Sequence, residues 1–212
     1  MGMSVNTNVG AMLALQNLNK SNKMLETTQL HITTGLKVNG PKDDAATYAI
    51  AQRMRGDIAG MGAVKTALSN GEATVNVAIT AGKAVADMLT EMKAKTVQAN
   101  QAGLDTASKD ALQNDFTSLR DQLTTIVQTA EFNGKNLITS TATSLTVLST
   151  VDGSTISVAA QKLDTTTLGI NASNISSGAS AALVAIDAAI NTVTSSLASM
   201  GSSSKRIDVQ SE

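Results

Sequence analysis

The sequence has 212 residues, of which 42% are hydrophobic and only 1% aromatic, with 16 basic and 17 acidic side chains and a net charge of −1. A chain of this length forms one or two cores, and with only Tyr48, Phe116 and Phe132 as rings those cores must be aliphatic, which disfavours ring-filled sandwiches and barrels. The balanced charge argues against a nucleic-acid groove or a polybasic membrane patch, because both need a concentrated positive field. With no Cys and a single His, His31, we predict no metal site, no cofactor and no enzymatic activity, and we assign His31 no role.

Neither end of the sequence shows a targeting or membrane segment. The opening Met1-Gly2 is interpreted as an expression-tag remnant before a native start at Met3, and no basic and apolar signal peptide follows it. No stretch approaches the roughly 20 apolar residues that span a bilayer, so we expect no membrane partner. The chain stops at Glu212 within a helical pattern, from which we expect the native protein to continue.

The first predicted helix carries a row of residues spaced alternately by four and three positions, as in a coiled-coil seam. Asn6 or Asn8 is positioned to cap this helix, and Gly35 marks its end. We interpret the row as a seam for another helix; the alternative is an ordinary amphipathic surface helix. The positions in the row are Ala11, Leu15, Leu18, Asn22, Leu25, Gln29, Ile32 and Leu36.

A polar connector follows at residues 35–44, where Gly and Pro break the helix and form an elbow. Asp43 and Asp44 resemble a carboxylate pair for metal or acid–base chemistry, but their place before a helix favours helix capping. The next helix is predicted from about Ala45 to about Gln98, with five glycines that each cost about 1 kcal/mol of helix propensity. That energy must come from neighbours packed along the helix.

Two further helices and a β element complete the predicted fold. Gly103 marks a turn into a helix that ends near Ala130, and a last helix is expected from Leu183 through Ile207. Between them, apolar spacing near two on either side of Asp152-Gly153 predicts a β-hairpin. The fold class is therefore mainly α: a long antiparallel, coiled-coil-like helical bundle with a small β-hairpin element. The predicted domains are residues 1–43, a terminal helix and elbow, and residues 44–212, a rod-like bundle with a Ser/Thr-rich β element at about 138–178.

Several blocks of the sequence, in order, resemble bacterial flagellin, specifically short flagellins without large outer domains. The blocks lie between Met3 and Leu137, with a weaker match after Ala181; they include Leu15-Gln-Asn-Leu18, Thr34-Gly35-Leu36, Lys42-Asp-Asp-Ala45, Ala49-Ile-Ala51 and Glu131-Phe-Asn-Gly134. The resemblance implies a structural subunit of the motility filament, secreted without a cleavable signal peptide. It implies homopolymeric partners, an export chaperone and a filament cap. It also places Leu15, Leu18, Leu25 and Ile32 in the inner tube, and leads us to expect truncation before a second, C-terminal inner helix.

The resemblance also bears on innate immunity. In the family, a vertebrate receptor contacts an Arg and a Leu one turn apart on the rod, and the matching positions here are Glu91 and Lys95. An anion in place of a cation and an ammonium in place of an apolar anchor remove the contacts on which such interfaces depend. We therefore expect weak or absent recognition.

Two other functions compete with the filament subunit. A hook-filament junction protein has similar terminal helices, but the Lys42 to Ala45 and Phe132 to Gly134 blocks favour flagellin. A signalling or scaffold coiled coil would explain the heptad spacing alone, and it predicts no β element between Thr139 and Ser180.

Overall fold

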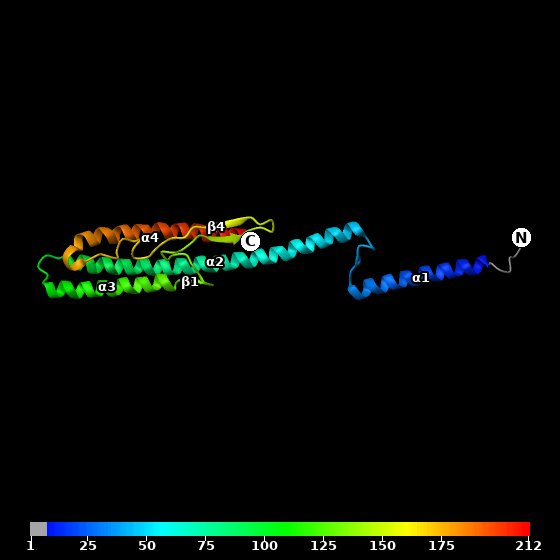
Figure 1. Ribbon diagram of the computed structural model, residues 1–212, viewed down its shortest axis with the longest axis horizontal. Coiled ribbons are helices and arrows are strands. Elements are labelled where there is room, and N and C mark those ends of the chain that lie inside the picture. Colours follow the sequence, from blue (N-terminus) through cyan, green and yellow to red (C-terminus); the bar gives the residue numbers. More distant parts are fainter. Residues whose placement is uncertain (1–7) are drawn as a thin grey trace. The chain divides into compact units, whose positions relative to one another are not determined.

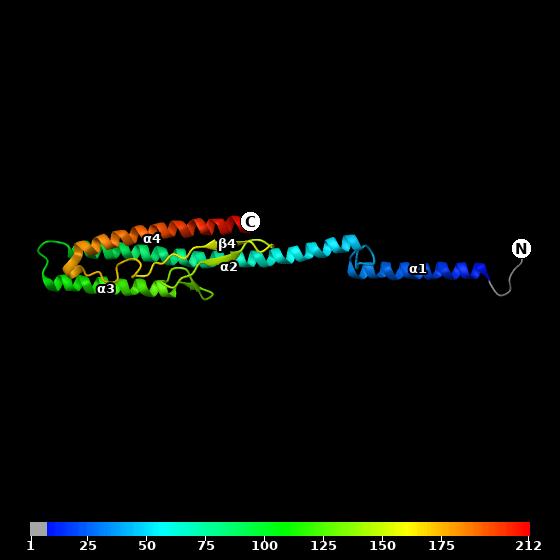
Figure 2. The same ribbon diagram turned by 45° about the horizontal axis from the view of Figure 1, so that its top comes forward.

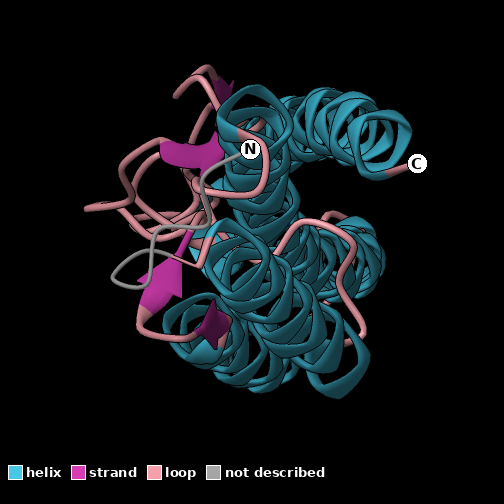
Figure 3. Ribbon diagram, turned by 90° about the vertical axis from the view of Figure 1, so that its right-hand side faces the viewer, coloured by secondary structure: helices cyan, strands magenta, loops and turns pink. Residues whose placement is uncertain are grey.

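The computed structural model describes residues 8–212 and is mainly helical (Figure 1). The predicted cap Asn6, the predicted tag remnant Met1-Gly2 and the predicted native start at Met3 lie outside the described residues. The elements are α1 (Val9–Thr34), α2 (Ala45–Ala99), α3 (Thr106–Thr129), β1 (Glu131–Phe132), β2 (Lys135–Asn136), β3 (Leu145–Leu148), β4 (Thr155–Val158) and α4 (Ile175–Ser211). Coloured by secondary structure, helix dominates and the strands are short (Figure 3). The fold class predicted from the sequence is confirmed.

The chain forms two compact units that divide within α2. One unit ends at Ala59, and the other comprises Gly60–Glu212. The predicted domain boundary at residues 43 and 44 stays a prediction. The first unit contains α1, the connector at residues 35–44 and the start of α2, and is described below with the candidate site. The second unit contains the hydrophobic core.

In the second unit, α2, α3 and α4 lie side by side (Figures 1 and 2). Gly103, with φ +87°, makes the turn after α2, and the side chain of Asp105 caps α3 by accepting a hydrogen bond from the Ser108 amide at 2.9 Å. Lys93 of α2 pairs with Asp187 of α4 at 2.7 Å. Further along, the Ser204 hydroxyl lies 3.5 Å from Asn76 Oδ1. Because the numbering falls along α2 as it rises along α4, these two contacts show that the helices are antiparallel.

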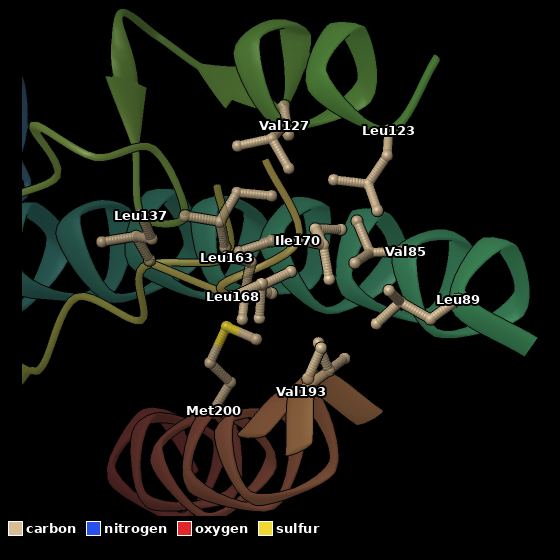
Figure 4. Close-up of a cluster of buried hydrophobic side chains, with 14 of the residues drawn as sticks. Val85, Leu89, Leu123, Val127, Leu137, Leu163, Leu168, Ile170, Val193 and Met200 are labelled. Carbon is tan, nitrogen blue, oxygen red and sulfur yellow. The ribbon is translucent and has the colours of Figure 1, made fainter. Parts of the chain in front are cut away.

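The core between these helices is aliphatic, as the composition requires. Each of the three helices and the segment between β4 and α4 contribute buried side chains to this core (Figure 4). They include Val85 and Leu89 of α2, Leu123 and Val127 of α3, Val193 and Met200 of α4, and Leu163, Leu168 and Ile170 of the segment before α4. Phe116 is fully buried, whereas Tyr48 and Phe132 are half-buried. Each fully buried aliphatic side chain contributes about 1.5–3 kcal/mol, so rows of Leu, Ile and Val hold this bundle together without ring packing.

The structure contains the predicted hairpin and a second one that was not predicted. In β3 and β4, Leu145 pairs with Val158 and Val147 with Ile156, while Gly153 in the loop has φ +90°. The second hairpin joins β1 to β2 through Asn133 and Gly134, which have φ of +50° and +71°. Asn-Gly is the usual signal for such a two-residue turn, but its strands have two residues each and show no alternation of apolar side chains.

Helix α4 begins at Ile175, earlier than the predicted Leu183, so the last serines of the Ser/Thr-rich stretch, including Ser176 and Ser177, lie in the helix. The Asn174 side chain accepts a hydrogen bond from the Ser177 amide at 3.1 Å. From α3, Gln113 Oε1 accepts the Ile175 amide hydrogen at 2.6 Å, and Asp110 accepts the Ser176 hydroxyl at 2.9 Å. Gly178 departs from helical geometry, with φ −136° and ψ 40°. Tertiary contacts with α3 therefore set the start of α4. The residues before Leu183 are mostly small and polar, so the apolar spacing of the sequence did not indicate this first part of the helix.

Three glycines of α2, eleven residues apart, allow close approach by other elements. A Cβ atom built at Gly60 would lie 2.5 Å from Val151 Cγ1, and one at Gly71 would lie 2.5 Å from Val147 Cγ2. At Gly82 the nearest atom would be Leu197 Cδ2, at 2.9 Å. The side chains of the β3–β4 region and of α4 thus occupy the space that a larger residue would fill. For these three of the five glycines, the structure contains the packed neighbours that the sequence predicted.

We predict that Gly71→Ala destabilises the protein. The new Cβ would also lie 3.0 Å from Val147 Cγ1, and a β-branched side chain held in a strand has little freedom to move away. Overpacking costs about 1–3 kcal/mol, which outweighs the roughly 0.5–1 kcal/mol that Ala gains over Gly in a helix. The matched control is Gly62→Ala, where no atom lies within 4 Å of the new Cβ, and which should raise stability. Urea unfolding midpoints measure both; a Gly71→Ala variant as stable as Gly62→Ala contradicts the close-approach explanation.

Candidate assembly surface

Helix α1 is well defined at both ends but exposed along its length. The Asn8 side chain accepts a hydrogen bond from the Ala11 amide at 3.2 Å, and Gly35, with φ +66°, closes the helix in the left-handed conformation. Among the described residues, none of those in α1 is buried. Its threonine hydroxyls donate hydrogen bonds to backbone carbonyls one turn earlier in the same helix, as Thr27 does to Lys23 at 2.9 Å. These hydrogen bonds therefore do not attach α1 to another element.

Four large apolar side chains, which we call the α1 row, lie exposed on this helix. Leu15 is 60% exposed, Leu18 57%, Leu25 67% and Ile32 76%. Two open hollows lie beside the row, one lined by Met12 and Leu15 and the other by Leu25 and Ile32. A helix of this kind standing alone in water is only marginally stable. The α1 row is therefore a surface suited to contact with another apolar surface.

The connector at residues 35–44 is organised by Asp43. Its Oδ2 accepts hydrogen bonds from the amides of Asn39 at 2.9 Å and Gly40 at 3.2 Å, and lies 3.4 Å from Nε2 of His31. The Asn39 hydrogen bond is the main cause that lowers the pKa of Asp43, with smaller lowering effects from His31 and Gly40. Asp43 thus holds the connector to itself and to the last turns of α1. His31, to which the sequence analysis gave no role, takes part in this contact.

Asp44 caps α2. Its Oδ1 accepts the amide hydrogens of Ala46 at 3.0 Å and Thr47 at 3.1 Å, and its Oδ2 accepts the Thr47 hydroxyl at 2.5 Å. The two adjacent aspartates therefore bond in different directions: Asp44 to the start of α2, and Asp43 to the connector.

A second exposed apolar set, which we call the α2 row, lies in the first part of α2. Ile50 is 57% exposed, Met54 59%, Ile58 67% and Met61 57%. The sequence pattern continues without a break into Val64 and Leu68, which are buried. Periodicity therefore identified the apolar face but not how much of it is exposed.

The two positions matched to the immune-receptor contact lie in the second unit, apart from the α1 row along the sequence. Glu91 is exposed on α2. Lys95 Nζ forms an ion pair with Asp115 Oδ2 of α3 at 2.6 Å. One matched position is thus an anion facing solvent, and the other is a cation that is already paired.

The described residues contain no group of three or more His, Asp or Glu side chains placed to hold a metal ion. They also contain no buried side-chain polar atom without a hydrogen-bond partner. The most conspicuous chemical feature of the first unit is thus exposed apolar surface on helices.

Comparison with known proteins identifies the family. The family model for the bacterial flagellin N-terminal helical region matches residues 5–143. The chain belongs to the bacterial flagellin family. Flagellin FljM of Caulobacter vibrioides is 42% identical over 208 residues, which cover 97% of this chain and 76% of that protein, and flagellin FljK is 41% identical over the same shares. Flagellin B of Rhizobium meliloti is 39% identical over 63% of this chain and 33% of that protein.

Solved structures agree with the fold. Bacillus cereus flagellin aligns with a TM-score of 0.62 at 21% identity, over 68% of this chain and 85% of that one. A Vibrio parahaemolyticus protein classed as flagellar hook-associated aligns with a TM-score of 0.66 at 16% identity, over 81% of this chain and 92% of that one. At these identities the structures show a shared helical fold. The function follows from the family: this flagellin is a structural subunit of the bacterial flagellar filament.

Helix α4 is long and apolar enough to cross a membrane by length and composition alone. No such stretch was predicted from the sequence, because Ser and Thr interrupt the aliphatic residues of this helix. One face of α4, including Ile186, Val193 and Met200, is buried in the bundle. A core helix passes the same length and composition test, so α4 gives little support for a membrane span.

We predict that the cap of α2 weakens in acid. The pKa of Asp44 is lowered from 3.8, chiefly by the Thr47 hydroxyl and then by the Thr47 amide. Because the folded chain favours the carboxylate, the stabilisation is complete above the ordinary aspartate pKa and is lost as pH falls through the lowered folded-state value. NMR titration should show the Ala46 and Thr47 amides losing exchange protection only in that acidic range. Asn is also a good cap, so Asp44→Asn should retain the exchange protection of these two amides at every pH. Asp44→Ala should lack this protection at every pH. Unchanged protection in Asp44→Ala would contradict the capping role of Asp44.

Proposed function

We propose that the α1 row is the surface through which this flagellin packs into the inner wall of the filament. The observation that carries the proposal is the exposure of helix α1. This 26-residue helix has apolar side chains at the spacing of a coiled-coil seam, and the described part of the chain buries none of its residues. Each Leu or Ile gains about 1.5–3 kcal/mol when fully buried. Contacts between different surfaces of identical subunits build an open helical assembly when their rotation does not close a ring.

The proposal assigns residues 1–43 to the inner tube and its elbow, and residues 44–212 to the bundle outside it. In this assignment Asp43 and Asp44 stiffen the link, because one carboxylate orders the connector and the other fixes the start of α2. The α2 row is a second apolar surface available for packing in the assembled filament. Resemblance to flagellins supports an export chaperone, a filament cap and secretion without a cleavable signal peptide.

The competing functions receive less support. The hook-filament junction protein was considered for its similar terminal helices, but the flagellar hook-associated protein that aligns with this chain is only 16% identical, whereas flagellin FljM is 42% identical over nearly the whole chain. The signalling coiled coil predicted no β element between Thr139 and Ser180, and β3 and β4 both lie in that interval. The flagellin family is structural, and we propose no catalytic role for this chain.

We predict that replacing two side chains of the α1 row prevents filament formation. The variant Leu18→Lys with Leu25→Lys removes apolar contact and would bury two charges, whose desolvation is costly. The matched control, Gln16→Lys with Thr27→Lys, adds the same charges on the opposite side of the helix and should assemble. Both are tested in the 212-residue chain and in a version extended by the C-terminal segment of flagellin FljM, by electron microscopy of a flagellin-deficient host.

The extended parent and the control should form filaments, and the extended Leu18, Leu25 variant should not. Circular dichroism of purified protein checks that the second unit remains folded in each variant. Filaments of normal length from the Leu18, Leu25 variant would refute the role of the α1 row. Lack of filaments from the extended parent would count against the proposed inner-wall packing as a whole.

We predict a weak response of the vertebrate flagellin receptor to this protein. Glu91 presents the wrong charge, and Lys95 is engaged with Asp115. A reporter-cell assay should show little activation by the parent and more by Glu91→Arg with Lys95→Leu. The control Asp87→Arg makes the same kind of charge reversal one turn away and should not increase the response. Strong activation by the parent would overturn this prediction.

A further inference from the structure

The sequence contains three Asn-Gly steps, at Asn39-Gly40, Asn70-Gly71 and Asn133-Gly134. In such a step the glycine backbone nitrogen can attack the asparagine side-chain carbonyl carbon, because glycine has no Cβ to obstruct the approach. The reaction requires a backbone free to rotate and an amide that can lose its proton. The structure places the three identical dipeptides in three different environments.

The steps at Asn70 and Asn39 are protected in different ways. Asn70 and Gly71 lie inside α2, where the helix fixes the backbone; Gly71 is buried, and the Thr74 hydroxyl donates to the Asn70 carbonyl at 2.8 Å. At the connector, the Gly40 amide donates to Asp43 Oδ2 at 3.2 Å. This hydrogen bond stabilises the protonated amide, and the nearby negative charge disfavours the ionised amide that would attack.

Neither kind of protection is present at Asn133-Gly134. Both residues are exposed and form a two-residue turn between strands of only two residues each. Among the hydrogen bonds of the described residues, none has the Gly134 amide as donor and none involves the Asn133 side chain; the side chain that bonds in this hairpin is that of Asn136, to the Val127 carbonyl at 2.8 Å and from the Ile138 amide at 2.8 Å. The next residue is Lys135, whose positive charge favours an ionised Gly134 amide. A short exposed hairpin also opens locally at low free-energy cost, which permits the rotation that the reaction needs.

We propose that Asn133 is the site of spontaneous deamidation in this protein, through a cyclic imide formed with Gly134. The bond formed joins Gly134 N to Asn133 Cγ, and the bond broken releases the side-chain nitrogen as ammonia, which carries away the proton lost from the amide. Water then opens the imide at either carbonyl. The products are aspartate, or isoaspartate with its side-chain carbon in the main chain.

The isoaspartate product changes the hairpin as well as its charge. Its extra main-chain carbon lengthens the two-residue turn, so the pairing of Phe132 with Lys135 is lost. Phe132 and Lys135 line a hollow together with Gly71 and Val147, next to the contact between α2 and β3. The modification therefore loosens the edge of the bundle at a defined place, and it accumulates with the age of the molecule.

Peptide mapping of the aged protein tests the proposal. The purified chain is incubated at mildly alkaline pH, folded or in urea, and digested with trypsin, which separates the three steps into peptides 38–42, 66–83 and 121–135. In the folded chain, Asn133 should gain the mass of an amide-to-acid exchange at least about tenfold faster than Asn39, the factor that one hydrogen bond to a charged group supplies. Asn70 should remain unchanged. Hydroxylamine, which cleaves the imide, should cut the folded chain after Asn133.

Two comparisons make the test decisive. In urea the three rates should approach one another, because the sequence step is the same in each. The variant Asp43→Ala removes the acceptor of the Gly40 amide and should accelerate Asn39 while leaving Asn133 unchanged. The proposal is overturned if Asn39 reacts as fast as Asn133 in the folded parent, if the folded order persists in urea, or if Asp43→Ala leaves Asn39 slow.

Discussion

Contact between aliphatic side chains along the length of helices is the constraint on which this structure depends. Few rings are available, so the burial of apolar surface must come from rows of Leu, Ile, Val and Met that run for many turns. In the second unit, rows from α2, α3 and α4 cover one another and the segment before α4 fills the space between them. The α1 row and the α2 row have the same composition without that cover. One physical requirement thus accounts for the stable bundle and supports the proposal that the exposed rows contact other subunits.

Much of the fold could be predicted because the helices are long and strongly periodic. The predicted span from about Ala45 to about Gln98 matches α2. Gly35 lies at the end of α1, and Gly103 lies in the turn between α2 and α3, as predicted. Capping by Asn8 and Asp44 follows from short-range geometry, which a sequence contains in full. The hairpin at Asp152-Gly153 combined a turn signal with alternating apolar residues, and the two signals together were sufficient.

The features that were not predicted depend on contacts between distant residues or on signals too short to recognise. The start of α4 is set by Gln113 and Asp110 of α3, more than sixty positions away. The pairing of His31 with Asp43 requires the connector to fold back. Exposure of the α2 row was not predictable either, since an apolar face has the same periodicity whether or not something covers it. Pattern alone therefore identifies the residues of the α1 row and the α2 row.

The glycines of α2 also fix the alignment of neighbouring segments. Val147 and Val151 rest on Gly71 and Gly60, which are separated by three helical turns. If the β3–β4 region slid along α2 by a single turn, Val147 would meet Ala67 or Val75, both of which carry the Cβ atom that the glycines lack. These glycines therefore act as notches: the hairpin seats in one position along the helix, and partial displacements meet a steric barrier. The glycines thus fix one register between the β3–β4 region and the long, otherwise repetitive aliphatic surface of α2.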